Sequence, residues 1–208
     1  MLAASRQDLR INVMTDLFLA LSLSYLLGSI SFAYIAGRIK GLDLSKEGTG
    51  TLGARNAGRK LGKAAGLFIL ILDILKGITA VAAAGLITEQ PIAPLIAWLG
   101  VVCGHCWSVF LGFRGGKGLA SSAGALLLIS PTLLFLEMLI MLVIITIFRN
   151  IYLAAIIATV FLPLTVWALG GHTYFITIAL LIALMILYRH KNNLADLRKS
   201  PPSRWRRK

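Results

Sequence analysis

Acidic residues are scarce in this chain, where eight Asp and Glu stand against 21 Lys and Arg in 208 residues and the formal net charge is +13. A strongly basic balance can indicate nucleic-acid binding. Here, however, the basic residues lie between and after long hydrophobic runs, as they do on the cytoplasmic faces of membrane proteins. We therefore expect no nucleic acid among the partners.

Cysteine is also rare, and the two that occur frame the tetrapeptide Cys103-Gly104-His105-Cys106. This is the active-site sequence of some thioredoxin-like oxidoreductases, but the motif is informative only in a βαβ setting, and no strand pattern flanks it here. A closed zinc site would need a second pair of ligands nearby, which the sequence lacks. We expect two thiols packed as small apolar residues, with no metal and no cofactor.

Long hydrophobic runs dominate the rest of the chain, which is 58% hydrophobic with a mean hydropathy of +0.84. Such values are typical of a polytopic membrane protein, because a span needs roughly 20 apolar residues. The fourth run is short and precedes Pro131, as a half-length helix would. We predict an all-α, integral membrane helical bundle of about seven transmembrane helices, at 14–36, 64–87, 92–111, 118–130, 132–148, 151–169 and 172–188.

Most basic residues fall in three segments, at 38–63, at 112–118 and after 188, while Arg6 and Arg10 precede the first predicted span. With seven spans all three lie on one side, and the positive-inside bias then puts the N-terminus outside and the C-terminus in the cytoplasm. The predicted organisation is an N-terminal arm at 1–13, a membrane domain at 14–190 and a basic cytoplasmic tail at 191–208. The tail suits anionic membrane lipids.

Two glycine-rich polar segments are candidates for holding a phosphate. Glycines let backbone N–H groups approach an anion, and basic side chains add charge. The second segment is not a Walker A loop, because no Ser or Thr follows Lys117, so ATP hydrolysis is not supported. For the first segment the alternative is an ordinary basic loop. The candidate residues are Gly48, Thr49, Gly50, Asn56 and Arg59 in the first, and Arg114, Gly115, Gly116, Lys117 and Gly118 in the second.

Two further pairs carry polar groups at helical spacing. Asp73 and Lys76 lie within the second predicted span, where isolated charges are costly, so we expect an ion pair that faces the bundle interior. It either fixes helix packing or adds to the positive field of the anion site. His190 and Asn193 share a face if the last helix continues past the membrane, although a histidine at a helix end is often a simple interfacial residue.

The order of these elements resembles one family. The matching stretches are Gly28-Ser29-Ile30, the Gly-x-Gly-x-x-Gly-Ala-x-Asn-x-x-Arg run at 48–59, Asp73 with Lys76-Gly77, Gly104-His105 with 108–111, Arg114 to Gly118, and His190 with Asn193. Over roughly residues 24–195 they resemble the PlsY family, bacterial acyl-phosphate:glycerol-3-phosphate acyltransferases. The resemblance implies an O-acyltransferase of the bacterial inner membrane, with its active site on the cytoplasmic side.

In that family, an acyl group moves from acyl phosphate to the first hydroxyl of glycerol 3-phosphate and gives lysophosphatidic acid and phosphate. The resemblance implies that Arg59 and Lys117 hold substrate phosphates, that the Gly115-Gly116 backbone cradles one of them, and that His190 and Asn193 complete the site with Thr49. It also implies no metal, no acyl carrier protein or coenzyme A donor, and a soluble enzyme that supplies acyl phosphate.

The chain departs from the family pattern in three stretches. Thr49 and Thr51 stand where serine and asparagine are typical, Arg55 stands where threonine is common, and residues 149–155, which include Tyr152, lack the serines that usually begin the sixth span. A serine contact near the acyl phosphate is therefore either absent or replaced by Tyr152. A divergent paralogue with another acceptor or little activity remains an alternative, as do a small-anion transporter and a non-catalytic membrane scaffold, although no inverted repeat is visible.

Overall fold

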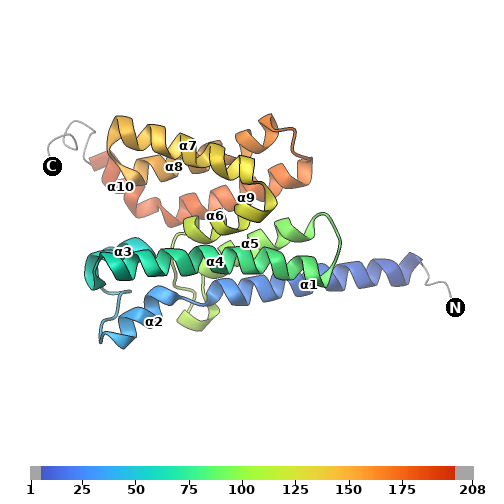
Figure 1. The fold of residues 1–208 in the computed structure, drawn as a ribbon, viewed down its shortest axis with the longest axis horizontal. Coiled ribbons are helices and arrows are strands. Elements are labelled where there is room, and N and C mark those ends of the chain that lie inside the picture. The colour runs from blue at the N-terminus through green and yellow to red at the C-terminus, as the bar shows by residue number, and fades with distance from the viewer. Residues whose placement is uncertain (1–5, 200–208) are drawn as a thin grey trace.

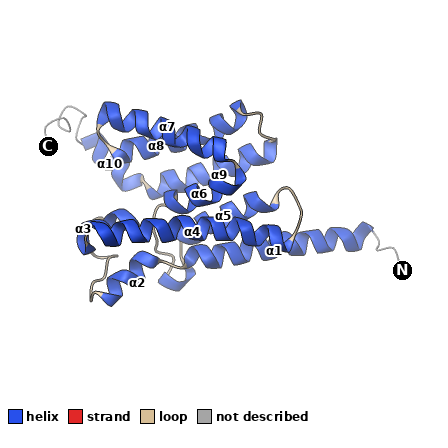
Figure 2. Cartoon of the chain, in the orientation of Figure 1, coloured by secondary structure: helices blue, strands red, loops and turns tan. Residues whose placement is uncertain are grey.

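The computed structural model describes residues 6–199, and within them every regular element is a helix (Figure 2). The ends of the predicted arm and tail, residues 1–5 and 200–208, lie outside this part. The elements in chain order are α1 Arg6–Ser29, α2 Phe32–Ile39, α3 Ala54–Leu61, α4 Lys63–Ile87, α5 Ala93–Cys106, the short 3-10 helix η1 Val109–Leu111, α6 Leu119–Ile129, α7 Pro131–Phe148, α8 Ile151–Ala168, α9 Thr173–Arg189 and α10 Lys191–Lys199.

A helix occupies each of the seven predicted spans. Four apolar stretches in the described residues are long enough to cross a membrane by themselves: 12–39, which includes most of α1, and the helices α4, α7 and α8. The apolar helices α5, α6 and α9 are shorter. The fold class is therefore as predicted, while the number of crossings and the orientation stay predictions.

Two predicted spans end earlier than expected. The first was predicted to continue to residue 36, but α1 ends at Ser29 and α2 begins at Phe32. The third was predicted to reach residue 111, but α5 ends at Cys106 and its chain turns into η1. Hydropathy alone does not mark these ends, because the residues beyond them are still apolar.

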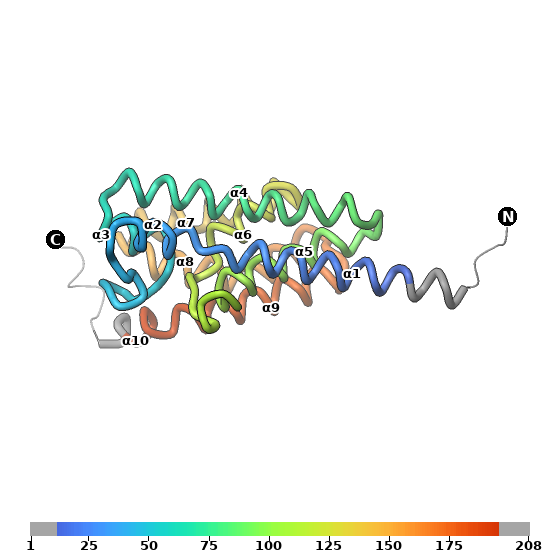
Figure 3. The backbone as a smooth tube through the Cα atoms, turned by 90° about the horizontal axis from the view of Figure 1, so that it is seen from below, coloured from blue at the N-terminus to red at the C-terminus, as the bar shows by residue number. Residues whose placement is uncertain are grey.

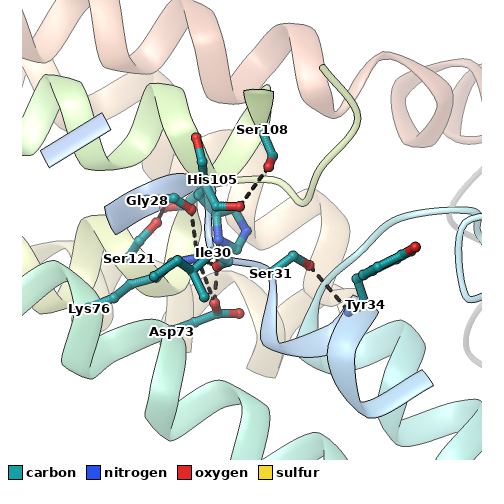
Figure 4. A network of polar contacts seen from close by, with 11 residues as sticks. Gly28, Ile30, Ser31, Tyr34, Asp73, Lys76, His105, Ser108 and Ser121 are labelled. Carbon is teal, nitrogen blue, oxygen red and sulfur yellow. Dashed lines mark hydrogen bonds and ion pairs between the residues drawn. The ribbon is translucent and has the colours of Figure 1, made fainter. Parts of the chain in front are cut away.

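The break after α1 is held by side chains from other elements. The Lys76 ammonium donates hydrogen bonds to the carbonyl oxygens of Gly28, at 3.0 Å, and Ile30, at 2.9 Å. The Ser108 hydroxyl donates to the Ser29 carbonyl at 2.6 Å, as Figure 4 shows. Carbonyls at a helix end need such partners, since apolar surroundings offer none. The helix can therefore stop within the bundle.

The helices form two groups. Helix α5, a member of the first group, and helix α6 contact helices of the second group. Helices α1, α4 and α5 pack side by side, α7, α8 and α9 form the second group, and α2, α3 and α10 lie together at one end, opposite the start of α1 (Figures 1 and 3). Glycine permits the closest crossings: a Cβ at Gly104 would lie 2.1 Å from the Tyr25 carbonyl oxygen, and one at Gly77 would lie 2.1 Å from that of Ser121. The three polar segments of the sequence thus meet at one end of the bundle.

Candidate functional site

A cavity of about 330 Å³, here called the amphipathic cavity, opens at the end of the bundle that carries α3 and α10. The polar lining comes from the 49–56 segment, the 116–118 loop, Asp73, His105 and His190, while α4, α6, α7 and α8 also contribute apolar side chains. Such a lining suits a molecule with an anionic head and a hydrocarbon tail. The lining residues are Thr49, Thr51, Gly53, Ala54, Arg55, Asn56, Leu70, Asp73, His105, Gly116, Lys117, Gly118, Leu119, Ala120, Met141, Ile151, Tyr152, Ala155 and His190.

Three helices begin at this cavity. Helices α3 and α6 start after Gly53 and Gly118, neither of which has a side chain to cap the first-turn N–H groups. Helix α8 starts after Asn150, whose side chain accepts from the N–H groups of Tyr152 and Leu153. The N-terminus of a helix carries partial positive charge and free N–H donors. The first residues of all three helices line the cavity, so their dipoles favour an anion there.

Lys117 is the cation placed most clearly in the amphipathic cavity. Its ammonium donates a hydrogen bond to the Asn193 side-chain oxygen and lies 4.4 Å from the centre of the Tyr152 ring. Burial, followed by the positive charge of Arg55 and other arginines, lowers the pKa of Lys117 to about 8. The amine is therefore mostly charged at neutral pH, in surroundings where a negatively charged ligand would stabilise it.

His190 lies at the end of α9 with a buried side chain. Its Nδ1 lies 2.9 Å from the Ile186 carbonyl oxygen, so Nδ1 carries the proton and Nε2 is a hydrogen-bond acceptor. Burial, together with the nearby Lys117 and Arg189 charges, lowers the pKa of His190 to about 4, although the Ile186 contact opposes the shift. The imidazole is therefore neutral at pH 7 and can accept a hydrogen bond from a hydroxyl group.

The loop before α3 is shaped by Asn56. Its Nδ2 donates to the carbonyl oxygens of Leu44, at 3.0 Å, and Glu47, at 2.9 Å, and its Oδ1 accepts from the Thr49 N–H at 3.1 Å. The chain turns through Gly48 at a φ of 58°, where a Cβ would lie 2.4 Å from Asn56 Oδ1. Sequence reasoning placed Asn56 among the substrate ligands. It lines the amphipathic cavity, and its amide also holds the loop that presents Thr49, so a ligand role stays a prediction.

The predicted glycine cradle is arranged differently from the expectation. The Gly116 N–H donates to the His105 carbonyl at 2.9 Å, and a Cβ on Gly116 would lie 2.1 Å from His105 Nε2. The carbonyl oxygens of Gly115 and Gly116 accept hydrogen bonds from the Arg189 guanidinium at 2.7 and 2.9 Å. These glycines are therefore required for packing against α5, and the N–H of Gly116 is already engaged.

The remaining two predicted arginines do not join Lys117. Arg114 lines a different cavity, and Arg59 is exposed and lines neither cavity, although its charge contributes to the low pKa of Lys117. Arg55, one helical turn before Arg59, takes the lining position. Sequence reasoning noted Arg55 only as a departure from a pattern, and Arg189 only as one of many basic residues near the C-terminus.

A second cavity of about 320 Å³, here called the polar cavity, lies beside the first. Thr49 and Thr51 line both cavities, and their hydroxyl oxygens are 2.8 Å apart. The two threonines thus form a shared wall. The polar cavity is lined by Ser45, Thr49, Gly50, Thr51, Phe113, Arg114, Gly115, Tyr188, Arg189, Lys191 and Asn192.

Figure 4 shows a buried ionic network of Asp73, Lys76 and His105, of which Asp73 and His105 line the amphipathic cavity. The predicted pair is confirmed: Asp73 Oδ1 is 3.0 Å from the Lys76 ammonium, and both side chains are almost fully buried. The sequence did not predict His105, whose Nδ1 lies 3.5 Å from the same oxygen. Both cysteines of the Cys103–Cys106 motif are free, and Cys106 belongs to the apolar core, as expected. Among the described residues, no cluster of His, Cys, Asp or Glu could hold a metal ion.

These features define an integral membrane protein that can hold an anionic, lipid-like ligand at the edge of its bundle. A family model described as glycerol-3-phosphate acyltransferase matches residues 18–200. The chain therefore belongs to the glycerol-3-phosphate acyltransferase family, of the PlsY type.

Individual relatives agree with this assignment. Proteins named glycerol-3-phosphate acyltransferase are 38% identical in Desulforamulus reducens, over 85% of this chain and 88% of the relative, and 40% identical in Neisseria meningitidis serogroup C, over 86% and 92%. The crystal structure of PlsY, an integral membrane glycerol 3-phosphate acyltransferase, in its glycerol 3-phosphate form matches with a TM-score of 0.81 at 34% identity, over 88% of this chain and 92% of that one.

Proposed function

We propose that this chain transfers a fatty acyl group from acyl phosphate to the sn-1 hydroxyl of glycerol 3-phosphate and releases lysophosphatidic acid and phosphate. The observation that carries the proposal is the pair of adjacent cavities that share Thr49 and Thr51. One suits a phosphorylated lipid chain and the other a small polar anion. A reaction between two anions needs such neighbouring sites, because positioning supplies much of the rate.

The amphipathic cavity would hold the acyl phosphate. Lys117 and the N-termini of α3, α6 and α8 would face the phosphate, and the apolar side chains of Leu70, Leu119 and Met141 would line the start of the acyl chain. Helix dipoles and an ammonium group stabilise negative charge more strongly in surroundings that exclude water. The donor would thus be fixed with its acyl carbon near the threonine wall.

The polar cavity would hold glycerol 3-phosphate. Arg114 and Lys191 line it and supply positive charge for the phosphate, while the Ser45 hydroxyl, which donates to Asp43 at 2.6 Å, would accept from the glycerol. Arg189 also lines this cavity, but two of its N–H groups are committed to the Gly115 and Gly116 carbonyls. It would position the loop between the two substrates rather than act mainly as a ligand.

The transfer step needs no covalent enzyme intermediate. The glycerol hydroxyl oxygen attacks the acyl carbonyl carbon, the bond between that carbon and the bridging phosphate oxygen breaks, and phosphate leaves with the bonding electrons. The hydroxyl proton passes to a phosphate oxygen, so the products are the ester and hydrogen phosphate. The neutral His190 would orient the hydroxyl by accepting a hydrogen bond at Nε2, and Thr49 would lie beside the reacting groups.

The same proposal places the enzyme in the bacterial inner membrane with both cavities on the cytoplasmic side. The basic segments at 38–63, 112–118 and 189–199 support it, since they gather at the end of the bundle that carries the cavities. The predicted tail does not stand apart from the site, because Asn193 in α10 contacts Lys117. A soluble enzyme would supply the acyl phosphate from the cytoplasm.

The test uses purified protein in sealed lipid vesicles, with palmitoyl phosphate in the membrane and radiolabelled glycerol 3-phosphate outside. We expect labelled lysophosphatidic acid from the wild type and from Lys40→Ala, a matched control at an exposed lysine outside both cavities. Lys117→Ala should lose at least a hundredfold in rate. Label that accumulates inside the vesicles without new lipid would instead support a transporter. The absence of both accumulated label and lipid product would support a scaffold.

A further inference from the structure

Two cavity-lining side chains from helices that are far apart in the chain meet in space. Arg55, in the first turn of α3, and Tyr152, in the first turn of α8, both line the amphipathic cavity. The Arg55 guanidinium carbon lies 4.0 Å from the centre of the Tyr152 ring, within the range of a cation–π contact. The guanidinium is therefore held at the wall of the cavity by the aromatic ring.

Lys117 contacts the same tyrosine ring as Arg55. Its ammonium lies 4.4 Å from the same ring, so one aromatic side chain contacts both cations of the cavity. Within the described part of the chain, Arg55 forms no ion pair with a carboxylate, and its positive charge acts on Lys117 without compensation. Two like charges held close together at helix N-termini favour a ligand with more than one negative charge.

Arg55 is suited to that ligand by its shape. A guanidinium is planar and offers parallel N–H donors, so it can bind two oxygens of one phosphate, whereas threonine offers a single hydroxyl. Contact with the Tyr152 ring restricts the long side chain in advance, which lowers the entropy lost on binding. Arg55 lines the amphipathic cavity and not the polar one, so its ligand would be the lipid-like substrate.

We propose that Arg55, held in place by the Tyr152 ring, binds the phosphate of the acyl donor together with Lys117 and determines the affinity of this chain for that donor. The proposal rests on the proposed function for the identity of the donor. Tyr152 is a positioning residue in this arrangement: its ring sets where the guanidinium lies, and its hydroxyl is not required.

The test measures KM for palmitoyl phosphate and for glycerol 3-phosphate separately. Arg55→Thr, which restores the residue common in the family, should raise KM for palmitoyl phosphate by about tenfold to a hundredfold, as the loss of a charge-assisted hydrogen bond would. KM for glycerol 3-phosphate should change by less than about threefold. The KM of Arg55→Lys for palmitoyl phosphate should lie between those of the wild type and Arg55→Thr, because lysine keeps the charge but lacks the planar guanidinium.

Tyr152 variants test the positioning role. Tyr152→Phe should keep the wild-type KM for the donor, and Tyr152→Leu should raise it. In the Arg55→Thr background, Tyr152→Leu should have a smaller effect than in the wild type, because the two residues then no longer interact. Equal effects in the two backgrounds would overturn the coupling. Arg38→Thr is the matched control, since Arg38 also lies over a tyrosine, at 5.1 Å from the Tyr34 ring, but lines neither cavity.

Calorimetric titration with dodecyl phosphate gives a readout that needs no turnover. The wild type should bind this non-reactive phosphorylated chain about tenfold or more tightly than Arg55→Thr. If the wild type binds it in this way but makes no lysophosphatidic acid, the proposed function fails while the phosphate-binding role of Arg55 stands. An Arg55→Thr protein with unchanged affinity and unchanged KM for the donor, or with the loss confined to glycerol 3-phosphate, would overturn the inference.

Discussion

The charge on Lys117 makes the activity depend on pH in a defined direction. Burial and the neighbouring Arg55 lower the pKa of this amine to about 8, whereas an exposed lysine titrates near 10.4. Only the protonated amine attracts the donor phosphate. At pH 7 about nine-tenths of the free enzyme is therefore competent, and at pH 9 about one-tenth is, since each unit beyond the pKa changes the ratio tenfold.

The quantity to measure is kcat/KM for palmitoyl phosphate, because it reports ionisations of the free enzyme. Formation of labelled lysophosphatidic acid at limiting donor should fall about eightfold to tenfold between pH 7 and pH 9, after subtraction of uncatalysed hydrolysis. At saturating donor the fall should begin at higher pH, because a bound phosphate favours the charged amine.

Lys117→Arg is the control, since a guanidinium stays charged throughout this range. The variant should be less active, because its side chain differs in length and shape, but its profile should be flat up to pH 9. A flat wild-type profile, or an identical fall in Lys117→Arg, would refute the assignment of this titration to Lys117.

Three other substitutions follow from the packing of the site. Gly116→Ala should lose most activity and unfold at lower temperature, because its Cβ would lie 2.1 Å from His105 Nε2. Overpacking of this kind costs roughly 1–3 kcal/mol of stability. Normal activity and a normal melting temperature would contradict this prediction. Asn56→Asp keeps the acceptor for the Thr49 N–H but loses both donated hydrogen bonds at a buried position, so activity should fall about tenfold and the melting temperature should fall as well, and full activity would show that the loop does not need these bonds. Asp73→Ala leaves the Lys76 ammonium without its buried partner and should cost roughly 3–5 kcal/mol of stability. Thermal unfolding in lipid measures this loss, and an unaltered midpoint would mean that the ion pair is not needed for folding.

Sequence reasoning located most of the framework. Hydropathy placed a helix in each of the seven runs, and helical spacing with the cost of isolated charge predicted the Asp73–Lys76 pair. It missed the early end of α1, because the partners of its last carbonyls are Lys76 and Ser108, which lie on distant segments. Such contacts depend on tertiary packing that periodicity does not encode.

The candidate site was likewise predicted only in part from the sequence. Lys117, Asn193 and His190 were recognised by motif order, and the structure brings the first two into contact. Gly116 was interpreted as part of an anion cradle because glycine-rich loops have that use, whereas the structure shows that it packs on His105, a contact that the sequence does not reveal. The contact between Arg55 and Tyr152 joins two helices that are far apart in the chain, and no local signal could have shown it.

The measurement that tests the account most directly is phosphorus NMR of the purified protein in lipid nanodiscs with palmitoyl phosphate and glycerol 3-phosphate. The account predicts that lysophosphatidic acid and phosphate appear in a ratio of one to one, that neither forms when either substrate is omitted, and that Lys117→Ala abolishes both signals. Phosphate released without lysophosphatidic acid, or no reaction of well-folded wild-type protein, would contradict it.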